Sequence, residues 1–205
     1  IYPKIKAANK PVVFVDSYIK GMDIPCVKSN NHDIIVSTLT SAYNIGYNEF
    51  IIITAEPSEI SVRKERLDAF REVVNTNNLN NKEIFLPPNI NDLNESYFKG
   101  LVENSIIPGK KNLIFVSNCW LLPKIFTSMK SILNKVPDEV GLVGFDNDEW
   151  INLISPTITS IIQPAYIEGH RAVETLLELI EDKDKKFPQF IEIQSQVIVN
   201  DTLKI

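Results

Sequence analysis

Short apolar runs that recur about every 30 residues constrain the fold of this chain more than any other feature, because a repeated strand–helix–strand unit needs about that length. Runs begin near positions 50, 84, 113 and 140, after an earlier one over 12–15. Each run is continuous rather than alternating, which is typical of strands covered on both faces in a parallel sheet. The spacing therefore predicts an α/β fold with helices on both faces.

Apolar stripes at helical spacing lie between these runs, and we interpret them as faces that pack on the core. The stripe from Gly169 to Ile180 is the most regular. Another, Tyr97–Val102, follows Asn91 and Asp92, either of which suits the N-cap of a helix. Helices are therefore expected between successive strands.

The pattern changes after Phe145. Residues 157–163 alternate like a strand that Pro164 ends, and a long helix is expected over about 166–182. Residues 190–199 alternate again and predict one last strand.

The composition excludes several classes of protein. With 205 residues, 44% of them hydrophobic, the chain can bury a core. No apolar run approaches the length of a membrane span, and no signal peptide is visible. The net charge of −5 argues against a nucleic-acid surface in this stretch. Cys26 and Cys119 have neither a CxxC partner nor a nearby histidine, which indicates a reduced cytosolic protein without a zinc site.

Polar side chains follow several of the predicted strands. Asp16, Ser17, Asn118 and Asp146 each lie just past a strand end. Open α/β sheets bind ligands beyond the carboxyl ends of their strands, and polar groups are costly to bury unpaired. A hydroxyl-rich ligand would satisfy these groups, and Asp146 can accept hydrogen bonds from two of its hydroxyls.

Two larger side chains extend this candidate site. Arg66 offers a rigid fork of donors for carboxylate or hydroxyl oxygens, and Trp150 could stack on an apolar sugar face. Taken alone, Arg66 is also consistent with a solvated helix charge, Asp146 with a cap or turn, and Trp150 with core packing. Catalysis is not indicated, since the seven glycines form no phosphate-binding or nucleophile motif and His32 and His170 are isolated.

Three segments carry a recognisable pattern. The first, IPCVKSN over 24–30, is similar to V-x-x-D-N, and the second, over 61–70, is similar to R-x-x-G-F. The third, over 143–172, resembles V-G-F-D-D … P-x-L-T-T-V-x-Q-P … G-x-x-A at the same spacing, and Asp201-Thr202 is similar to a closing R-D-S/T. As an ordered set they resemble the LacI/GalR family of bacterial transcription regulators. The chain departs from the family pattern at Ser29, Ala69, Cys119 and Asn200.

The resemblance implies a two-lobed α/β core of the type I periplasmic-binding-protein kind, with parallel sheets. Three segments would cross between the lobes, near 29–30, 163–164 and 187–188. A small molecule would bind between the lobes.

These crossings imply a first lobe made of residues 1–29 plus 164–187, and a second made of 30–163 plus 188–205. The first lobe would be incomplete in this chain. The family's DNA-binding headpiece would also lie outside it, so we expect residues upstream of Ile1 in the natural protein.

The resemblance also implies an effector site, with no catalytic residue, metal or cofactor. The segment 146–150 is similar to regulators of gluconate or ketodeoxygluconate use, which implies a sugar acid paired with Arg66. The expected effector-binding residues are Arg66, Asp146, Asn118, Trp150, Gln163, Ser17, Ser29 and Asn30.

The implied function is the effector-sensing and dimerisation core of a cytoplasmic LacI-type transcriptional regulator, expected to be a repressor. Its partners would be a sugar or sugar acid, a second copy of the chain, and operator DNA through the headpiece, with no membrane. A sugar-binding protein of a transporter shares the fold and is the alternative, although the segment 159–164 and Asp201-Thr202 favour the regulator. An α/β enzyme is the third hypothesis.

Overall fold

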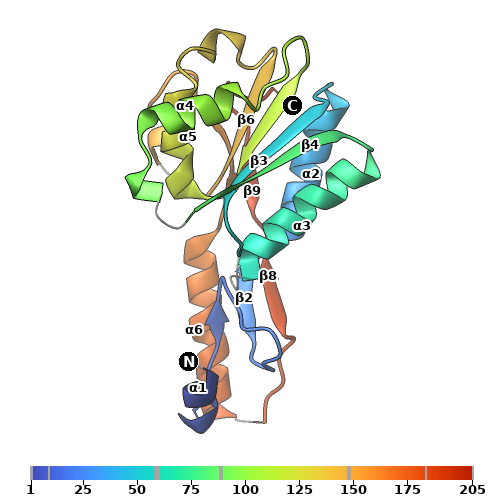
Figure 1. Cartoon of the computed structure of the whole chain (residues 1–205). Helices are drawn as coiled ribbons and strands as arrows, with labels where there is room; N and C mark the ends of the chain where they lie inside the picture. The colour runs from blue at the N-terminus through green and yellow to red at the C-terminus, as the bar shows by residue number, and fades with distance from the viewer. Residues whose placement is uncertain are drawn as a thin grey trace.

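The strands form two sheets, one below the other in Figure 1. The computed structural model describes residues 2–8, 10–57, 61–87, 90–146, 149–182 and 184–204. The smaller sheet is parallel, and its strands in spatial order are β1 (Phe14–Val15), β2 (Cys26–Ser29) and β8 (Phe190–Ile193).

The larger sheet is parallel except for its last pair, in which β9 runs antiparallel to β7. Its strands in spatial order are β4 (Asn80–Leu86), β3 (Glu49–Ala55), β5 (Asn112–Val116), β6 (Val140–Phe145), β7 (Thr159–Ile162) and β9 (Gln196–Ile198). Every residue of β3, β5 and β6 is buried, which explains why these strands are continuous apolar runs. The predicted α/β class is confirmed.

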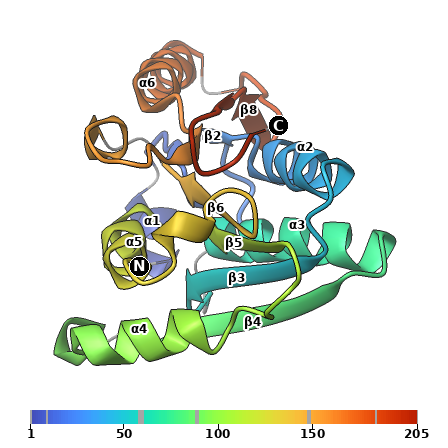
Figure 2. The same cartoon turned by 90° about the horizontal axis from the view of Figure 1, so that it is seen from above.

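Two helices cover each face of the larger sheet (Figure 2). On one face lie α2 (Asn31–Asn44) and α3 (Ser61–Thr76), and on the other lie α4 (Glu95–Glu103) and α5 (Leu122–Ser128). In the described residues, four 3₁₀ turns complete this part: η1 (Ile90–Asp92), η2 (Cys119–Leu121), η3 (Leu133–Lys135) and η4 (Glu149–Asn152). Among the described residues, no helix has the length and apolar character needed to cross a bilayer.

The N-cap of α4 differs from the prediction. Asn94 caps the helix, and its side-chain oxygen accepts a hydrogen bond from the backbone N–H of Tyr97 at 2.9 Å. Asn91 and Asp92 lie instead in the turn η1. The same residue type therefore caps the helix, three positions nearer to it than Asn91, where its oxygen reaches an N–H without an intrahelical partner.

The smaller sheet packs against α6 (Ala165–Glu181), while α1 (Tyr2–Ala8) precedes β1. The expectation that the apolar stripe of this long helix packs on the core holds for Ala172 and is wrong for three other residues of the stripe. Val173, Leu177 and Ile180 are each more than half exposed. The helix buries Glu168, Ala172 and Thr175, which are four and three positions apart and form a face that shares only Ala172 with the predicted stripe.

The chain passes between the two sheets three times. The first passage follows Ser29, and the second lies at Gln163-Pro164, between β7 and α6. The third follows Ile193, not the expected position 187–188, because β8 pairs with β2 and extends the smaller sheet. Residues 188–193 therefore do not join the larger unit, to which the sequence had assigned them.

The expected last strand over 190–199 is divided into β8 and β9, which lie in different sheets. Asn30 holds the bend between them. Its Oδ1 accepts a hydrogen bond from the backbone N–H of Ser195 at 2.7 Å, and its Nδ2 donates to Oε1 of Gln194 at 2.8 Å. The alternation of apolar residues continues through the bend, so the sequence alone does not reveal it.

Candidate functional site

Polar residues from both sheets come together where the sheets meet, at the lower edge of the larger sheet in Figure 1. Asp16 follows β1 and Ser29 ends β2, whereas Asp146 follows β6 and Gln163 follows β7. All four lie at the carboxyl ends of parallel strands, which is where open α/β sheets bind ligands. The helices α3 and α6 begin beside them, and contribute Arg66 from the second turn of α3 and Glu168 from the first turn of α6.

Arg66 is the centre of this cluster and is only 6% exposed. Its Nε donates to Oδ1 of Asn31 at 3.2 Å, its Nη1 to the carbonyl oxygen of Ser117 at 2.8 Å, and its Nη2 to Oε1 of Gln163 at 3.4 Å. Its guanidinium carbon lies 3.7 Å from the centroid of the Phe145 ring. The guanidinium is thus held by contacts on three sides and against an aromatic face.

Two aspartates supply negative charge to the cluster. Burial lowers the pKa of the Arg66 guanidinium, and the carboxylates of Asp16 and Asp146 counteract that effect. Both aspartates have left-handed backbone, with φ of 60° and 87°, an uncommon conformation for residues other than glycine. Neighbouring strands fix that backbone, since the N–H of Asp16 donates to Val27 and that of Asp146 to Ile161.

Gln163 connects the two sheets within the cluster. Its Nε2 donates to Oδ1 of Asp16 at 3.3 Å and to Oγ of Ser29 at 3.2 Å, while its Oε1 accepts from Arg66. Asp16 and Ser29 belong to the smaller sheet, whereas Arg66 lies on a helix that covers the larger one. One amide therefore contacts both halves of the molecule at a crossing segment.

Glu168 closes this group from α6 and is 3% exposed. The hydroxyl of Ser29 donates a hydrogen bond to its Oε1. Burial raises the pKa of the Glu168 carboxyl, the hydrogen bond from Ser29 opposes that shift, and the charges of Asp16 and Asp146 add to it. The carboxyl is therefore costly to ionise at this position, mainly because it is buried.

A second path of contacts reaches Arg66 from the smaller sheet. Lys28 of β2 is 5% exposed, and its Nζ lies 2.7 Å from Oε1 of Glu65 and 3.2 Å from Oε1 of Glu192. The other oxygen of Glu65 accepts from Nδ2 of Asn31 at 3.1 Å, and Asn31 in turn accepts from Arg66. A buried ion pair thus connects β2 to α3 next to the cluster.

Four of the eight predicted site residues are brought together here: Arg66, Asp146, Gln163 and Ser29. Ser17 lies beside them, and its hydroxyl donates to Oδ2 of Asp16 at 3.4 Å. Their role as effector ligands stays a prediction.

Asn118 adjoins the cluster, but its oxygen has another use. That Oδ1 accepts from the backbone N–H of Ala55 at 2.9 Å and from the hydroxyl of Thr54 at 3.2 Å. It therefore joins the end of β5 to the end of β3, directly after Ser117, whose carbonyl holds Arg66. Asn118 therefore holds the backbone of neighbouring strand ends together at the edge of the site.

Two predicted residues have other surroundings. Asn30 holds the bend between β8 and β9 and does not hydrogen-bond to Arg66 or Gln163 among the described contacts. Trp150 packs against the apolar cluster under α4 and α5, with its ring centroid 6.1 Å from that of Phe126. Core packing, the simpler interpretation of Trp150, matches this environment.

Sequence reasoning did not single out Asn31, Ser117 or Glu168 as parts of the site. Asn31 and Ser117 follow or precede residues that it did select, so adjacency was a usable signal. Glu168 stands four positions before Ala172, on the face of α6 that is buried. A carboxylate on a buried helical face is rare without a partner, but the sequence does not show that this face is the buried one, so no local signal identified Glu168.

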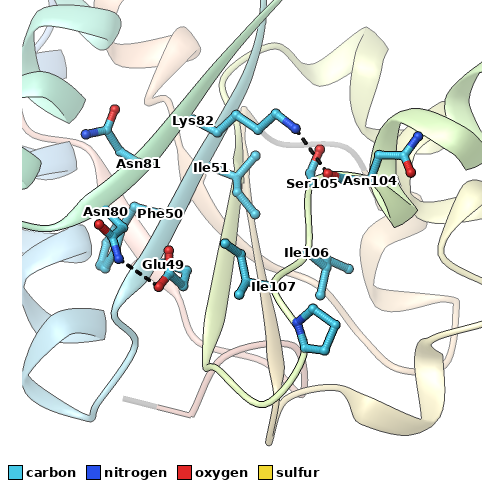
Figure 3. A pocket seen from close by; sticks show the side chains of 11 residues that line it. Glu49, Phe50, Ile51, Asn80, Asn81, Lys82, Asn104, Ser105, Ile106 and Ile107 are labelled. Carbon is cyan, nitrogen blue, oxygen red and sulfur yellow. Dashed lines mark hydrogen bonds between the residues drawn. The ribbon is translucent and has the colours of Figure 1, made fainter.

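The structure offers no metal centre in its described part, since no three His, Cys, Asp or Glu side chains there are grouped closely enough to hold an ion. A cavity of about 540 Å³ lies elsewhere, at the amino ends of β3 and β4 (Figure 3). Its polar side chains pair locally: Asn80 donates to Glu49, and Lys82 donates to the carbonyl oxygen of Asn104. This cavity is at the opposite end of the strands from Arg66.

The molecule has two β-sheets flanked by helices, and the chain crosses between them three times. Polar strand ends gather at the junction of the sheets. This arrangement defines a periplasmic-binding-protein-like fold. The family model of the periplasmic binding protein-like domain matches residues 41–203. The HTH-type transcriptional regulator KdgR of Bacillus subtilis (strain 168) is 30% identical over 193 residues, which cover 94% of this chain and 57% of that protein.

Solved structures agree with this fold. The transcription regulator CcpA of Lactococcus lactis has a TM-score of 0.80 at 20% identity, covering 100% of this chain and 73% of that one. A periplasmic binding protein/LacI transcriptional regulator from Alkaliphilus metalliredigens QYMF, solved in complex with D-xylulofuranose, has a TM-score of 0.77 at 20% identity, covering 96% of this chain and 72% of that one.

The chain belongs to the periplasmic binding protein-like domain family, and it is homologous to LacI-family transcriptional regulators. The resemblance seen in the sequence is thereby confirmed. The chain spans a little over half the length of KdgR.

Proposed function

We propose that this chain is the effector-sensing part of a LacI-type transcriptional regulator, and that a sugar or sugar acid binds at Arg66 where the two sheets meet. The observation that carries the proposal is the buried Arg66 guanidinium, hydrogen-bonded to Gln163 at a crossing between the sheets and flanked by the Asp16 and Asp146 carboxylates. Homology to regulators adds support.

The chemistry of the cluster suits hydroxyl groups, which both donate and accept hydrogen bonds. An arginine has five N–H donors, and protein oxygens use three of those of Arg66 among the described residues. The remaining donors can reach a hydroxyl or carboxylate oxygen of the ligand. Asp16 and Asp146 can accept from hydroxyls, which offsets the cost of burying their charge.

A ligand at this position would act on the angle between the sheets. Gln163 and Ser29 both stand where the chain crosses from one sheet to the other. A ligand that binds one angle more tightly shifts the population toward it by its difference in affinity. In a dimer, that angle would set the spacing of two DNA-binding headpieces, whose half-sites lie about one DNA turn apart.

The test is a thermal-shift and calorimetric screen of neutral sugars, aldonic acids and sugar phosphates on the full-length protein. A ligand at about 100 times its Kd stabilises the wild type by about 2.7 kcal/mol. Arg66→Ala should lose that shift. The matched control is Arg71→Ala on the same helix, because Arg71 makes a surface pair with Glu83 away from the cluster.

Equal shifts in Arg66→Ala and Arg71→Ala would remove Arg66 from the site. The regulatory half of the proposal is tested separately, by whether the ligand that binds also changes the affinity of the full-length protein for promoter DNA. Binding of the ligand without any effect on DNA affinity would favour the transporter alternative.

A further inference from the structure

A buried carboxyl on α6 has no place in the proposed contacts with the ligand. Glu168 is 3% exposed and lies in the first turn of the helix, where it accepts the hydroxyl hydrogen bond of Ser29. An apolar side chain would fill such a position at lower cost, since a buried carboxyl must be compensated by hydrogen bonds or charges. The contacts around Glu168 indicate what the carboxyl does there.

The hydrogen bonds of this group have only one consistent direction. Arg66 can only donate, so the atom of Gln163 that faces it must be the oxygen, Oε1. The NH₂ group of Gln163 then faces Asp16 and the oxygen of Ser29. Because Ser29 accepts from Gln163, its own hydroxyl hydrogen is directed to a different acceptor, and that acceptor is Oε1 of Glu168.

We propose that Glu168 is a positioning residue for the effector site, which orients the Ser29 hydroxyl and, through it, the Gln163 amide that holds Arg66. This inference rests on the proposed function, because it concerns the same site. Glu168 itself contributes no contact to the ligand. Its carboxyl oxygen fixes the direction of the Ser29 hydroxyl, and so adds to the constraint that Arg66 and Asp16 place on the Gln163 amide.

This role distinguishes Glu168 from a residue that only fills space. Rotation of the Gln163 amide would place its NH₂ group against the Arg66 guanidinium, where two donors face each other. The hydrogen bonds from Glu168 through Ser29 to Gln163 add to the cost of that state before the ligand arrives, and such preorganisation raises affinity. A leucine of similar volume would preserve packing but supply no acceptor, whereas a glutamine would still present an oxygen to Ser29.

The experiment compares Glu168→Leu and Glu168→Gln in the full-length protein, with Glu181→Leu and Glu181→Gln as matched controls at an exposed position of the same helix. The probes are D-glucose, D-ribose and D-gluconate, measured by calorimetry. Glu168→Leu should weaken binding about 2- to 10-fold, the loss expected for one hydrogen bond, and Glu168→Gln should retain near wild-type affinity. The control variants should bind like the wild type.

A second measurement needs no ligand. The side-chain amide resonances of Gln163 and the Nε–H resonance of Arg66 should shift in Glu168→Leu and stay close to their wild-type positions in Glu168→Gln. Ser29→Ala breaks the next link, so combining it with Glu168→Leu should add little to either single change.

The outcomes separate the two proposals. If a probe binds the wild type but Glu168→Leu binds it as tightly and leaves both resonances in place, the positioning role is overturned and the proposed function stands. Equal losses in Glu168→Leu and Glu168→Gln would also overturn it, because a glutamine keeps the acceptor. If no probe binds the wild type, the ligand-free resonances decide the positioning role on their own, and the proposed function is judged separately by the wider ligand screen.

Discussion

The ion pair between Lys28 and Glu65 provides a sharp test of how the two halves of the molecule are joined. Lys28 belongs to the smaller sheet and Glu65 to α3, which covers the larger sheet. The side chains of Lys28 and Glu65 are 6% and 17% exposed, whereas that of Glu192, the second partner of Lys28, is 44% exposed. Replacing Lys28 by methionine keeps most of its volume and removes its charge.

The expected loss of stability depends on the charges that remain after the lysine is replaced. Breaking a buried ion pair by removing one partner costs about 3–5 kcal/mol, because the other charge stays buried and uncompensated. Glu192 can turn to water and Glu65 keeps its hydrogen bond from Asn31, so the charge left behind is partly compensated. We therefore expect Lys28→Met to lower the free energy of unfolding by about 3 kcal/mol, the low end of that range.

Urea unfolding of the full-length protein measures this loss. Lys64→Met is the matched control. Lys64 stands next to Glu65 on α3 and makes an exposed pair with Asp68, which is expected to contribute about 0.3–0.5 kcal/mol. The double variant Lys28→Met with Glu65→Leu removes both buried charges and should recover much of the loss. If Lys28→Met costs no more than Lys64→Met, the argument from burial is wrong.

The loss should also be independent of pH near neutrality. Burial lowers the pKa of Lys28, but pairing with Glu65 and Glu192 outweighs it, and the net pKa is raised. A raised lysine pKa contributes stability that is complete below the unfolded pKa and is lost only as pH rises through the folded one. Between about pH 6 and 9 the effect of Lys28→Met should therefore be constant, since an unperturbed lysine titrates near 10.4.

Three further predictions concern stability and reactivity. Gly141→Ala should destabilise the fold by about 1–3 kcal/mol in urea unfolding, because its Cβ would lie 2.8 Å from the ring of Tyr47, which is 2% exposed. Native Cys26 should not react with iodoacetamide at pH 8, as mass spectrometry would detect, because it is fully buried and burial raises the pKa of its thiol to about 12. Glu168→Gln should raise Tm at neutral pH but not near pH 4, since a carboxyl with a raised pKa costs stability as pH rises above its unfolded value; an equal change at both pH values would contradict this.

Strands were predictable where every residue is apolar and covered on both faces. The run over 140–145 is the strand β6 with the same bounds. β2 was not predicted, because it has four residues and contains Lys28. The partners that allow this lysine to be buried come from α3 and β8, far away in the sequence, and no local pattern indicates them.

The buried face of α6 shows a different limit. Periodicity located the helix to within a residue at each end, but apolar residues occupy more than one of its faces. Which face is covered depends on the shape of the smaller sheet. That sheet receives Ala172 and Thr175 and leaves Val173 and Leu177 in contact with solvent.

Within the candidate site, motif spacing located Arg66 and Asp146, and strand-end position located Asn118. Spacing could not reveal that the Asn118 oxygen is used by the backbone of Ala55, since that bond joins residues 63 positions apart. Tertiary packing decides which polar groups hydrogen-bond to each other. The sequence therefore identifies candidate residues, and the structure shows what each of them contacts.

Two independent paths connect the smaller sheet and α6 to the same guanidinium. One runs from Glu168 through Ser29 and Gln163, and the other from Lys28 through Glu65 and Asn31. Since both paths end on Arg66, a change in the angle between the sheets should stretch or replace a contact along them, either at this side chain or at a link such as Lys28–Glu65. A ligand that binds Arg66 and the angle of the sheets are then thermodynamically linked, and each biases the other by the same free energy. Substitutions in either path should therefore alter ligand affinity and the distribution of angles together, which titration followed by solution scattering would measure, and a variant that moves only one of the two would show that the paths do not couple them.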